Sequence, residues 1–297
     1  MHTTAVIIID VVTILSVCLI IGIGPYIKKV TNNYFFWLTL SLCLLIYLSI
    51  FRFYDEFSDF WKHGNDHSVR TSRGLLLDIC PFCSFLICAV LIADPTRKLA
   101  KITAPFGLFG GLITILGGIG DEMINIGDLP MWKYIFIGDS ANPMYFMMHY
   151  LNVVLSVLIL VSVPKMRFAD WIYCNFFAAT YYGYVGICMV SLNVTDHVSG
   201  LNLNDWDLGG EYSGVAEIFK VGPAAAAAIG FSLSYLCISG IIWGQSCLQK
   251  FKRYRWYDMW NKKTWYFGWY LLTPTEIKEP KSLLYRLKKI LIHGFRK

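Results

Sequence analysis

Long apolar runs, separated by short polar connections, constrain the fold of this chain more than any other feature. A helix needs about 20 mostly apolar residues to cross the hydrocarbon core of a bilayer. Because a backbone exposed to lipid must satisfy its own hydrogen bonds, each long run is expected to be a helix. The predicted spans are residues 5–27, 34–54, 74–93, 104–120, 143–163, 169–192 and 223–246. The sequence therefore predicts an all-α integral membrane protein, a bundle of seven transmembrane helices.

The composition favours a membrane protein over a soluble one. Hydrophobic residues make up 56% of the 297 residues and charged residues 15%, whereas soluble domains usually carry about 25% charged residues. We expect a membrane domain over residues 1–246 and a basic, aromatic-rich cytoplasmic tail over residues 247–297. Residues 281–297 place Leu and Ile on one helical face and basic residues on the other, which is typical of a helix lying on an anionic inner leaflet. Binding of an unknown protein partner is the alternative for this tail.

The distribution of Lys and Arg predicts the orientation of the bundle. With seven spans, the connections 28–33, 94–103 and 164–168 lie on the same side as the tail, and all three carry basic residues. From Cys247 onward the chain adds 13 Lys and Arg against three Asp and Glu. Because cytoplasmic connections are enriched in Lys and Arg, we expect the N-terminus outside and the C-terminus in the cytoplasm of a multi-pass cell-membrane protein. The net charge of +6 comes from the tail and does not indicate binding of nucleic acid.

Several predicted spans carry ionisable side chains close to the same membrane depth. These residues are Asp10, Arg52, Asp78, Cys80 and His149. At 1.5 Å per residue, all of them fall within roughly 10 Å of the outer boundary. A charged residue at the centre of a span costs roughly 2.5–3.5 kcal/mol, so such residues usually face a cavity or a partner. We predict a shared polar pocket that opens outward; the alternative is that these side chains extend individually to the headgroups, which fits Asp10 and Arg52 best. Asp170 and Asn175, near the inner surface, are expected to be isolated.

Within this pocket, Cys80 and His149 form a minimal pair for nucleophilic catalysis. A thiol is a weak nucleophile until a neighbouring base takes its proton, and His149 is the only histidine in a predicted span. Asp78 or Asp10 is available to orient the imidazole, and Arg52 to hold a phosphate headgroup. The expected substrates are membrane lipids carrying an ester, a thioester or an acyl chain.

Two other functions stay open from the residues alone. Cys80-Pro-Phe-Cys83 has the spacing of a redox motif, but membrane thiol oxidases pass electrons to a second cysteine pair in an outer loop, and the predicted outer loops contain no cysteine. A non-enzymatic protein that binds or transports lipids or small molecules is the other alternative. The chain has no G-x-S-x-G, Walker A or H-E-x-x-H motif, and no cofactor or metal is expected.

Residues 74–205 resemble the YwaF-like integral membrane proteins. The segment LLLDICPFCSFLICAVLIADPTRKLAKITAPFGLFGGLITIL is similar to that family's third span, basic turn and Gly-rich fourth span. The next two spans of the family resemble PMYFMMHYLNVVLSVLILVSV and NFFAATYYGYVGICMVSLNVTDHVSGLN. Cys80, His149 and Asn193 stand at the family's cysteine, histidine and asparagine, whereas Asp78 stands where the family often has histidine.

This resemblance implies an activity on lipids. The YwaF-like family is similar to a eukaryotic transmembrane acyltransferase of ether phospholipids and, more distantly, to the androgen-induced membrane hydrolases. For this chain it implies acyl transfer or hydrolysis with Cys80 as nucleophile, His149 as base and Asn193 in support. Besides Asp78, two features depart from the family: a Pro-Asp after the fourth span is missing, unless Asp121 supplies the acid, and the basic tail has no counterpart.

Overall fold

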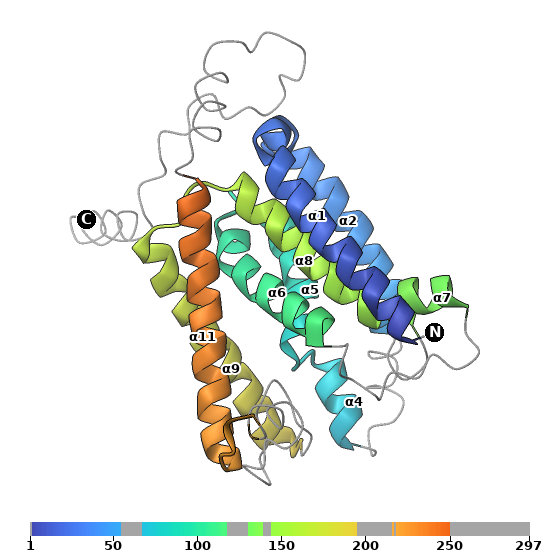
Figure 1. Ribbon diagram of the computed structural model, residues 1–297, viewed down its shortest axis with the longest axis vertical. Helices are drawn as coiled ribbons and strands as arrows, with labels where there is room; N and C mark the ends of the chain where they lie inside the picture. The colour runs from blue at the N-terminus through green and yellow to red at the C-terminus, as the bar shows by residue number, and fades with distance from the viewer. Residues whose placement is uncertain are drawn as a thin grey trace, which may run out of the picture. The chain divides into compact units, whose positions relative to one another are not determined.

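The computed structural model describes residues 2–54, 67–117, 130–138, 144–194, 216 and 218–249. These residues form helices and connecting turns without a β-strand, which confirms the all-α prediction for this part of the chain (Figure 1). All of them belong to one compact unit, residues 1–263. Asp121 and the predicted tail beyond Gln249 lie outside the described residues.

The apolar runs of the sequence form long helices, since a helix satisfies its own backbone hydrogen bonds without water. In chain order the elements are α1 (His2–Thr31), α2 (Tyr34–Leu48), the π-helix η1 (Ser49–Phe53), α4 (His67–Gly74), α5 (Ile79–Ala93), α6 (Lys98–Gly117), α7 (Met131–Phe136), α8 (Tyr145–Ser162), α9 (Phe168–Leu192) and α11 (Pro223–Leu248). Six stretches are long and apolar enough to cross a membrane: Val6–Gly24, Tyr34–Phe53, Thr71–Ala93, Lys98–Leu116, Tyr145–Ser162 and Ala228–Leu248. These helices are those of a multi-pass membrane protein.

The predicted span at residues 169–192 corresponds to α9, which is not among these six stretches. Asp170, Asn175 and four tyrosines lower the mean hydropathy of this helix. Its 25 residues are long enough to cross a bilayer, at roughly 37 Å for a rise of 1.5 Å per residue. Length and hydropathy therefore disagree for α9, and the described helices confirm six candidate spans rather than seven.

The predicted span at residues 104–120 begins too late. Helix α6 starts six residues earlier, at Lys98, and residues 118–120 lie outside the described part of the chain. The Asp94 carboxylate accepts hydrogen bonds from the backbone N–H groups of Thr96 and Leu99, at 2.9 and 3.0 Å. Because the first N–H groups of a helix have no intrahelical partner, this side chain stabilises the early start.

The predicted continuous helix over residues 74–93 is interrupted at its start. Helix α4 ends at Gly74, Leu76 adopts a left-handed backbone with φ 53°, and α5 begins only at Ile79. Two hydroxyl groups from α9 donate to carbonyl oxygens at this break, Tyr181 to Leu77 and Tyr184 to Leu75. A broken helix at membrane depth is tolerated when neighbouring side chains satisfy its backbone in this way. As a result, the N-terminus of α5 lies inside the helix bundle.

Helices α5, α6 and α8 form the centre of the described bundle, with α1 packed on α8 and α2 on α5 (Figure 1). The closest pairing is that of α6 and α8, and glycines allow it. A Cβ atom added to Gly111 would lie 2.7 Å from the carbonyl oxygen of His149. Small residues at such positions let membrane helices approach closely. By contrast, α9 and α11 contact α6 only sparsely.

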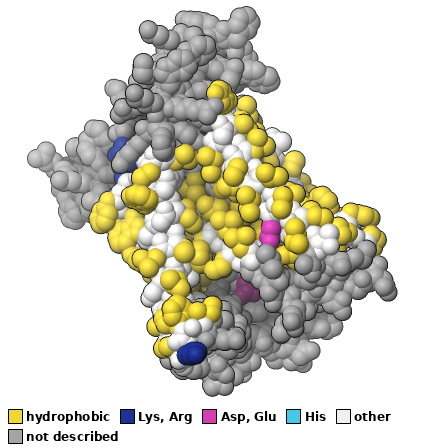
Figure 2. Space-filling model, viewed as in Figure 1, with side chains coloured by type: hydrophobic (Ala, Val, Ile, Leu, Met, Phe, Trp, Pro, Cys, Tyr) yellow, Lys and Arg dark blue, Asp and Glu magenta, His cyan; other side chains and the backbone are white. Residues whose placement is uncertain are grey.

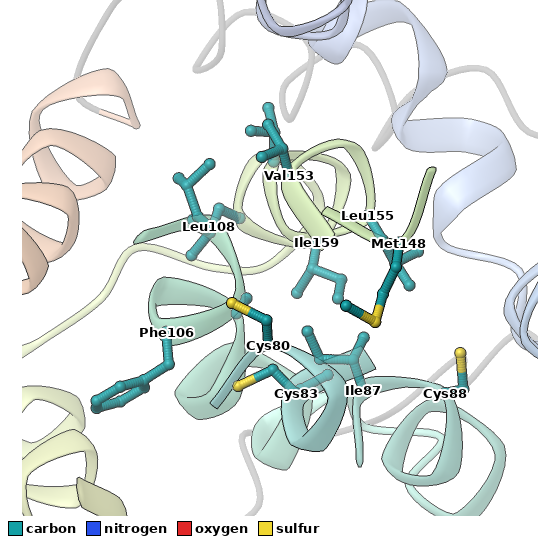
Figure 3. Close-up of a cluster of buried hydrophobic side chains, with 14 of the residues drawn as sticks. Cys80, Cys83, Ile87, Cys88, Phe106, Leu108, Met148, Val153, Leu155 and Ile159 are labelled. Atoms are coloured by element: carbon teal, nitrogen blue, oxygen red, sulfur yellow. The ribbon is translucent and has the colours of Figure 1, made fainter. Parts of the chain in front are cut away.

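The core between these helices contains three cysteines of α5, which lie among hydrophobic side chains of α6 and α8 (Figure 3). Cys80 and Cys83 point to the same side of α5, and Cys88 points the other way (Figure 3). None of the nine cysteines, all of which lie in the described part of the chain, forms a disulfide. Cys80, Cys83, Cys88 and Cys174 are buried, where a free cysteine packs as a small apolar residue.

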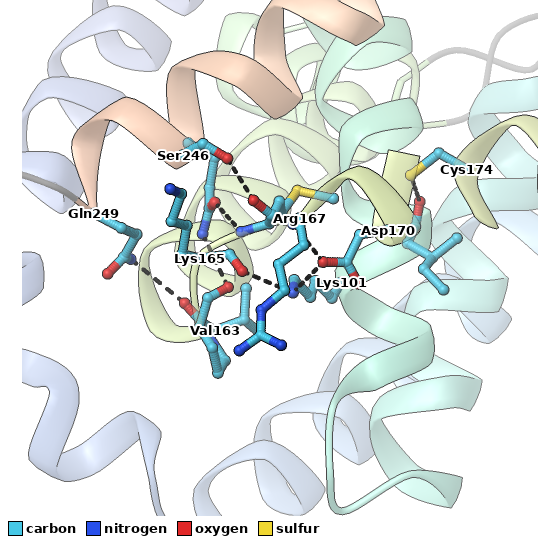
Figure 4. Close-up of polar contacts among 12 residues, drawn as sticks. Lys101, Val163, Lys165, Arg167, Asp170, Cys174, Ser246 and Gln249 are labelled. Atoms are coloured by element: carbon cyan, nitrogen blue, oxygen red, sulfur yellow. Dashed lines mark hydrogen bonds and ion pairs between the residues drawn. The ribbon is translucent and has the colours of Figure 1, made fainter. Parts of the chain in front are cut away.

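The C-terminal end of α11 is fastened to the connection between α8 and α9 (Figure 4). Gln245 is the central residue of this contact: its Oε1 accepts from Met166 N at 2.8 Å, and its Nε2 donates to Leu160 O at 3.0 Å. Ser246 Oγ donates to Met166 O, and Gln249 Nε2 donates to Val163 O. Over the apolar stretch Ala228–Leu248 of α11, only 17% is buried.

Candidate functional site

A cavity of about 1180 Å³ lies where α9 and α11 approach the central helices. Figure 2 shows a hollow with a hydrophobic floor on the face between α11 and α1, which is otherwise covered mainly by hydrophobic side chains. Four of the predicted site residues line the cavity, namely Arg52, Asp78, Cys80 and His149. They come from four separate elements, η1, the turn before α5, α5 and α8. The predicted convergence of polar groups from several helices therefore occurs.

Cys80 lies in the first turn of α5, two residues after the N-cap residue Asp78. Its backbone carbonyl accepts a hydrogen bond from Asn152 Nδ2 on α8 at 3.0 Å, and Ser84 Oγ donates to the same oxygen at 2.9 Å. Both partners are buried. These contacts fix the first turn of α5 against α8 and so determine where the thiol lies.

Helix α6 forms the surroundings of the thiol. Thr114 Oγ1 lies 3.8 Å from Cys80 Sγ, a hydrogen bond in which either group can be the donor. A Cβ atom added to Gly110 would lie 3.0 Å from the sulfur, so the glycine leaves the space that the thiol occupies. The thiol also lies near the N-terminus of α5, and the unpaired N–H groups and dipole of a helix N-terminus favour a negative charge.

His149 is buried on α8, with 5% of its surface exposed. Its Nδ1 is hydrogen-bonded to the carbonyl oxygen of Tyr145, one helical turn earlier. Because a carbonyl oxygen only accepts, Nδ1 carries the proton in this contact, and Nε2 is left as the nitrogen that can accept one. The imidazole is also packed edge-on against the Tyr145 ring, with centroids 4.9 Å apart. The group that orients the ring is thus a backbone carbonyl rather than a carboxylate of Asp78 or Asp10.

The two remaining predicted residues do not line this cavity. Asp10 is buried in α1, where its Oδ1 has no hydrogen-bond partner among the described residues. Asn193 ends α9 with φ 51°, a left-handed conformation that asparagine tolerates at a helix C-terminus. Their supporting roles in the chemistry of Cys80 and His149 stay predictions.

Several residues of the site were not predicted from the sequence. Asn152 follows His149 by three residues and Ser84 follows Cys80 by four, so helical spacing places each on the same face as its partner. That spacing could have identified both residues. Arg73 and Thr114 also line the cavity, but their positions depend on the break before α5 and on the pairing of α6 with α5.

The prediction that Asp170 and Asn175 are isolated is wrong. Asp170 forms an ion pair with Lys101 at 2.7 Å (Figure 4), and Asn175 lines the cavity. The reason is that α6 starts at Lys98 and so brings a lysine beside the start of α9. The polar groups of the bundle therefore extend over more of its depth than the sequence predicted.

The redox alternative gains little from this geometry. Cys83 is fully buried and does not line the described part of the cavity, so only one thiol of the Cys80-Cys83 motif is accessible from it. Within the described residues, no group of three His, Cys, Asp or Glu side chains could hold a metal ion.

The sequence of this chain is similar to known proteins over most of its length. Residues 11–267 match the group described as "Family of unknown function (DUF5378)". The chain is 30% identical to "Uncharacterized protein MG135" of Mycoplasma genitalium over 240 residues, which cover 77% of this chain and 84% of that protein. It is 31% identical over 245 residues to the MG135 homolog of Mycoplasma pneumoniae, with the same coverage. No solved structure matches the chain. The matched region contains Cys80, His149 and every other residue of the candidate site described here except Asp10, and the chain belongs to the DUF5378 family.

Proposed function

We propose that this protein transfers or hydrolyses an acyl group of a membrane lipid, with Cys80 as the nucleophile and His149 as the base. The observation that carries the proposal is that both side chains, from different helices, line one cavity within a bundle of apolar helices. A second support is the free acceptor nitrogen of His149, since its Nδ1 is already engaged by Tyr145. The resemblance of residues 74–205 to the YwaF-like proteins is consistent with the same activity.

The proposed reaction has two half-reactions. His149 Nε2 takes the proton of the Cys80 thiol as the sulfur attacks the carbonyl carbon of a lipid ester. A C–S bond forms, the ester C–O bond breaks, and the departing lysolipid oxygen receives the proton from His149. In the second half, a lipid hydroxyl or water attacks the acyl-cysteine and gives its proton to His149, which returns it to the sulfur as the C–S bond breaks. Arg52 is proposed to bind the phosphate of the headgroup, because a guanidinium matches phosphate geometry.

We further propose that α9 is the seventh span and that the protein lies in the cell membrane with its N-terminus outside. The connection between α5 and α6 carries Arg97, and the connection between α8 and α9 carries Lys165 and Arg167, all on the expected cytoplasmic side. The cavity residues Arg52, Asp78 and His149 would then lie toward the outer leaflet. The tail beyond residue 250 is proposed to dock on anionic lipids of the inner leaflet.

A non-enzymatic lipid-binding or transport protein is the second candidate. The size of the cavity favours it, because about 1180 Å³ exceeds the roughly 300–1,000 Å³ of most small-molecule sites. In that case the cavity would hold a lipid without forming a bond to Cys80.

Covalent capture of an acyl group distinguishes the two candidates. The protein in lipid nanodiscs is incubated with a phospholipid that carries an alkyne-tagged acyl chain, and adducts are mapped by mass spectrometry. We expect a hydroxylamine-sensitive adduct on Cys80 that is absent from Cys80→Ala and strongly reduced in His149→Ala, since an unassisted thiol reacts slowly.

Cys174→Ala is the matched control for this experiment. Cys174 also lines the cavity but its thiol faces a carbonyl oxygen, that of Ile102, at 3.5 Å. This variant should keep the adduct on Cys80. Lipid that co-purifies with the wild type without any thioester would favour the binding candidate, and equal labelling of Cys80 and Cys174 would contradict a specific nucleophile.

A further inference from the structure

The charged groups of the cavity lie together at one end. Among the described lining residues these are Arg52, Arg73 and Asp78, and they come from the end of η1, the end of α4 and the turn before α5. Within the described lining, two guanidinium groups therefore stand against one carboxylate. Cys80 and His149 lie at this same end, because Cys80 follows Asp78 by two residues and His149 is near the start of α8.

From this end the cavity extends along α9 and α11. Its lining on α9 runs from Tyr182 back to Trp171, and its lining on α11 runs from Phe231 to Ile242. Each stretch covers 12 residues, which rise by roughly 16 Å at 1.5 Å per residue. One leaflet of a bilayer contributes about 15 Å of hydrocarbon, half of a core about 30 Å thick. The cavity is thus about as long as the acyl layer of one leaflet.

Ring contacts and hydrogen bonds establish the direction of this extension. Tyr182 and Phe231 meet with centroids 5.6 Å apart, next to the tyrosines that hold the break before α5. At the other end, Trp171 Nε1 donates to Ser239 Oγ at 3.2 Å and so joins α9 to α11. The described lining between these ends carries no charged side chain and includes Phe106, Ala178 and Ile238. An extended apolar chain fits this surface.

We infer that the cavity binds a phospholipid in one orientation, with its phosphate against Arg52 and Arg73 and one acyl chain between α9 and α11. This inference rests on the proposed function for its chemical meaning, but the binding itself does not require any reaction. The orientation selects the bond that Cys80 can reach. Since Cys80 is at the charged end, the carbonyl beside it belongs to the glycerol ester and not to the distal part of the chain.

Photolabelling tests the orientation. Phosphatidylglycerol and diacylglycerol probes, each with a diazirine at the end of one acyl chain, are added to the full-length protein in neutral phosphatidylcholine vesicles, and cross-links are mapped by mass spectrometry. We expect the phosphatidylglycerol probe to label the Trp171–Ala178 and Ile238–Ile242 regions. The diacylglycerol probe should label these regions of the wild type roughly tenfold less, the effect of losing a charge-assisted hydrogen bond. The phosphatidylglycerol probe should show the same roughly tenfold loss in Arg73→Gln.

Lys133→Gln is the control, since Lys133 on α7 is an exposed cation that does not line the cavity. It should leave labelling unchanged. Two results on the wild-type protein alone would overturn the inference. One is equal labelling by the two probes, and the other is labelling confined to exposed, lipid-facing side chains such as Ile187 and Trp243.

Cys80→Ala separates this inference from the proposed function. Labelling of the α9 and α11 regions that persists in Cys80→Ala, with no acyl-cysteine in the wild type, would support the binding orientation and contradict the enzyme. An acyl-cysteine on Cys80 together with phosphate-independent labelling would support the enzyme and overturn the orientation.

Discussion

At the turn between α5 and α6, the Asp94 carboxylate accepts hydrogen bonds from Thr96 and from the first backbone N–H groups of α6. Partial burial of Asp94 raises its pKa, but the hydrogen bonds from Thr96, Leu99 and Lys98 outweigh this and hold the pKa below its ordinary value. One side chain therefore fixes the start of α6, and with it the position of Lys101 beside Asp170.

Replacing this carboxylate should destabilise the protein in a pH-dependent way. Asp94→Ala is expected to cost about 1 kcal/mol at neutral pH, the usual effect of losing a helix cap. A carboxyl group with a lowered pKa stabilises the fold above its unfolded pKa of about 3.9, and this contribution disappears as the pH falls through the folded pKa. The Tm difference between Asp94→Ala and the wild type, measured by circular dichroism in detergent, should therefore be full at pH 7 and shrink below about pH 4.

Lys98→Ala is the control for this prediction, because the Lys98 side chain is exposed and lies in the same turn. Its Tm should follow that of the wild type at every pH. A difference for Asp94→Ala that stays constant down to about pH 3 would show that the carboxylate charge is not what stabilises the turn.

At the scale of helices, the glycine face of α6 determines how the site is assembled. Gly110 faces the sulfur of Cys80 on α5, and Gly111 faces the backbone of His149 on α8. Helix α6 thus contacts the helices of both proposed reactive residues. Overpacking at this face should push α8 away and disturb the site at the same time.

Gly111→Ala tests this close approach. Its Cβ would lie 2.7 Å from the His149 carbonyl oxygen and 2.8 Å from Val153 Cγ2. Overpacking of this kind typically costs about 1–3 kcal/mol, so we expect a lower Tm in detergent and less acyl-adduct on Cys80.

Gly186→Ala provides a matched comparison on α9, where a new Cβ would meet nothing within 4 Å. Since alanine is favoured over glycine inside a helix by up to about 1 kcal/mol, the Tm of this variant should stay the same or rise. Equal losses of stability in both variants would mean that glycine flexibility, and not helix packing, matters at Gly111.

At the scale of the whole molecule, the orientation depends on whether α9 crosses the membrane. If it does, the C-terminal ends of α8 and α11 lie on the same side of the membrane. The hydrogen bonds from the end of α11 to Met166, in the connection between α8 and α9, require this arrangement. The described contacts of Gln245 and Ser246 with Met166 are thus consistent with seven spans.

Reporter fusions test this topology. Alkaline phosphatase, which is active only outside the cytoplasm, is fused after Leu192 at the end of α9 and after Leu248 at the end of α11. Seven spans with an outer N-terminus predict an active fusion at Leu192 and an inactive one at Leu248, and a green fluorescent protein fusion should give the inverse pattern. Activity at both positions would contradict the predicted orientation, because α11 would then not cross.

The sequence alone determined the class of the protein and which polar residues to examine. Apolar runs and the scarcity of charge are local properties, so they predict membrane helices without knowledge of their neighbours. The same reasoning identified Arg52, Asp78, Cys80 and His149, because an ionisable residue within an apolar run is costly wherever that run packs. Hydropathy could not decide whether α9 crosses the membrane, because its tyrosines lower the mean hydropathy of the helix. In the structure, two of these tyrosines donate hydrogen bonds to the backbone at the break before α5.

Only the tertiary structure decided how these residues are arranged. The break before α5 depends on hydroxyl groups of Tyr181 and Tyr184, about a hundred residues away in the chain. The partner of His149 is a carbonyl of its own helix, and the space beside Cys80 exists because Gly110 lies opposite. Periodicity predicts which face of a helix is apolar, but not which helix will cover it. The cavity, its charged end and the exclusion of Asp10 from it follow from that pairing of helices, which arises from packing between distant parts of the chain.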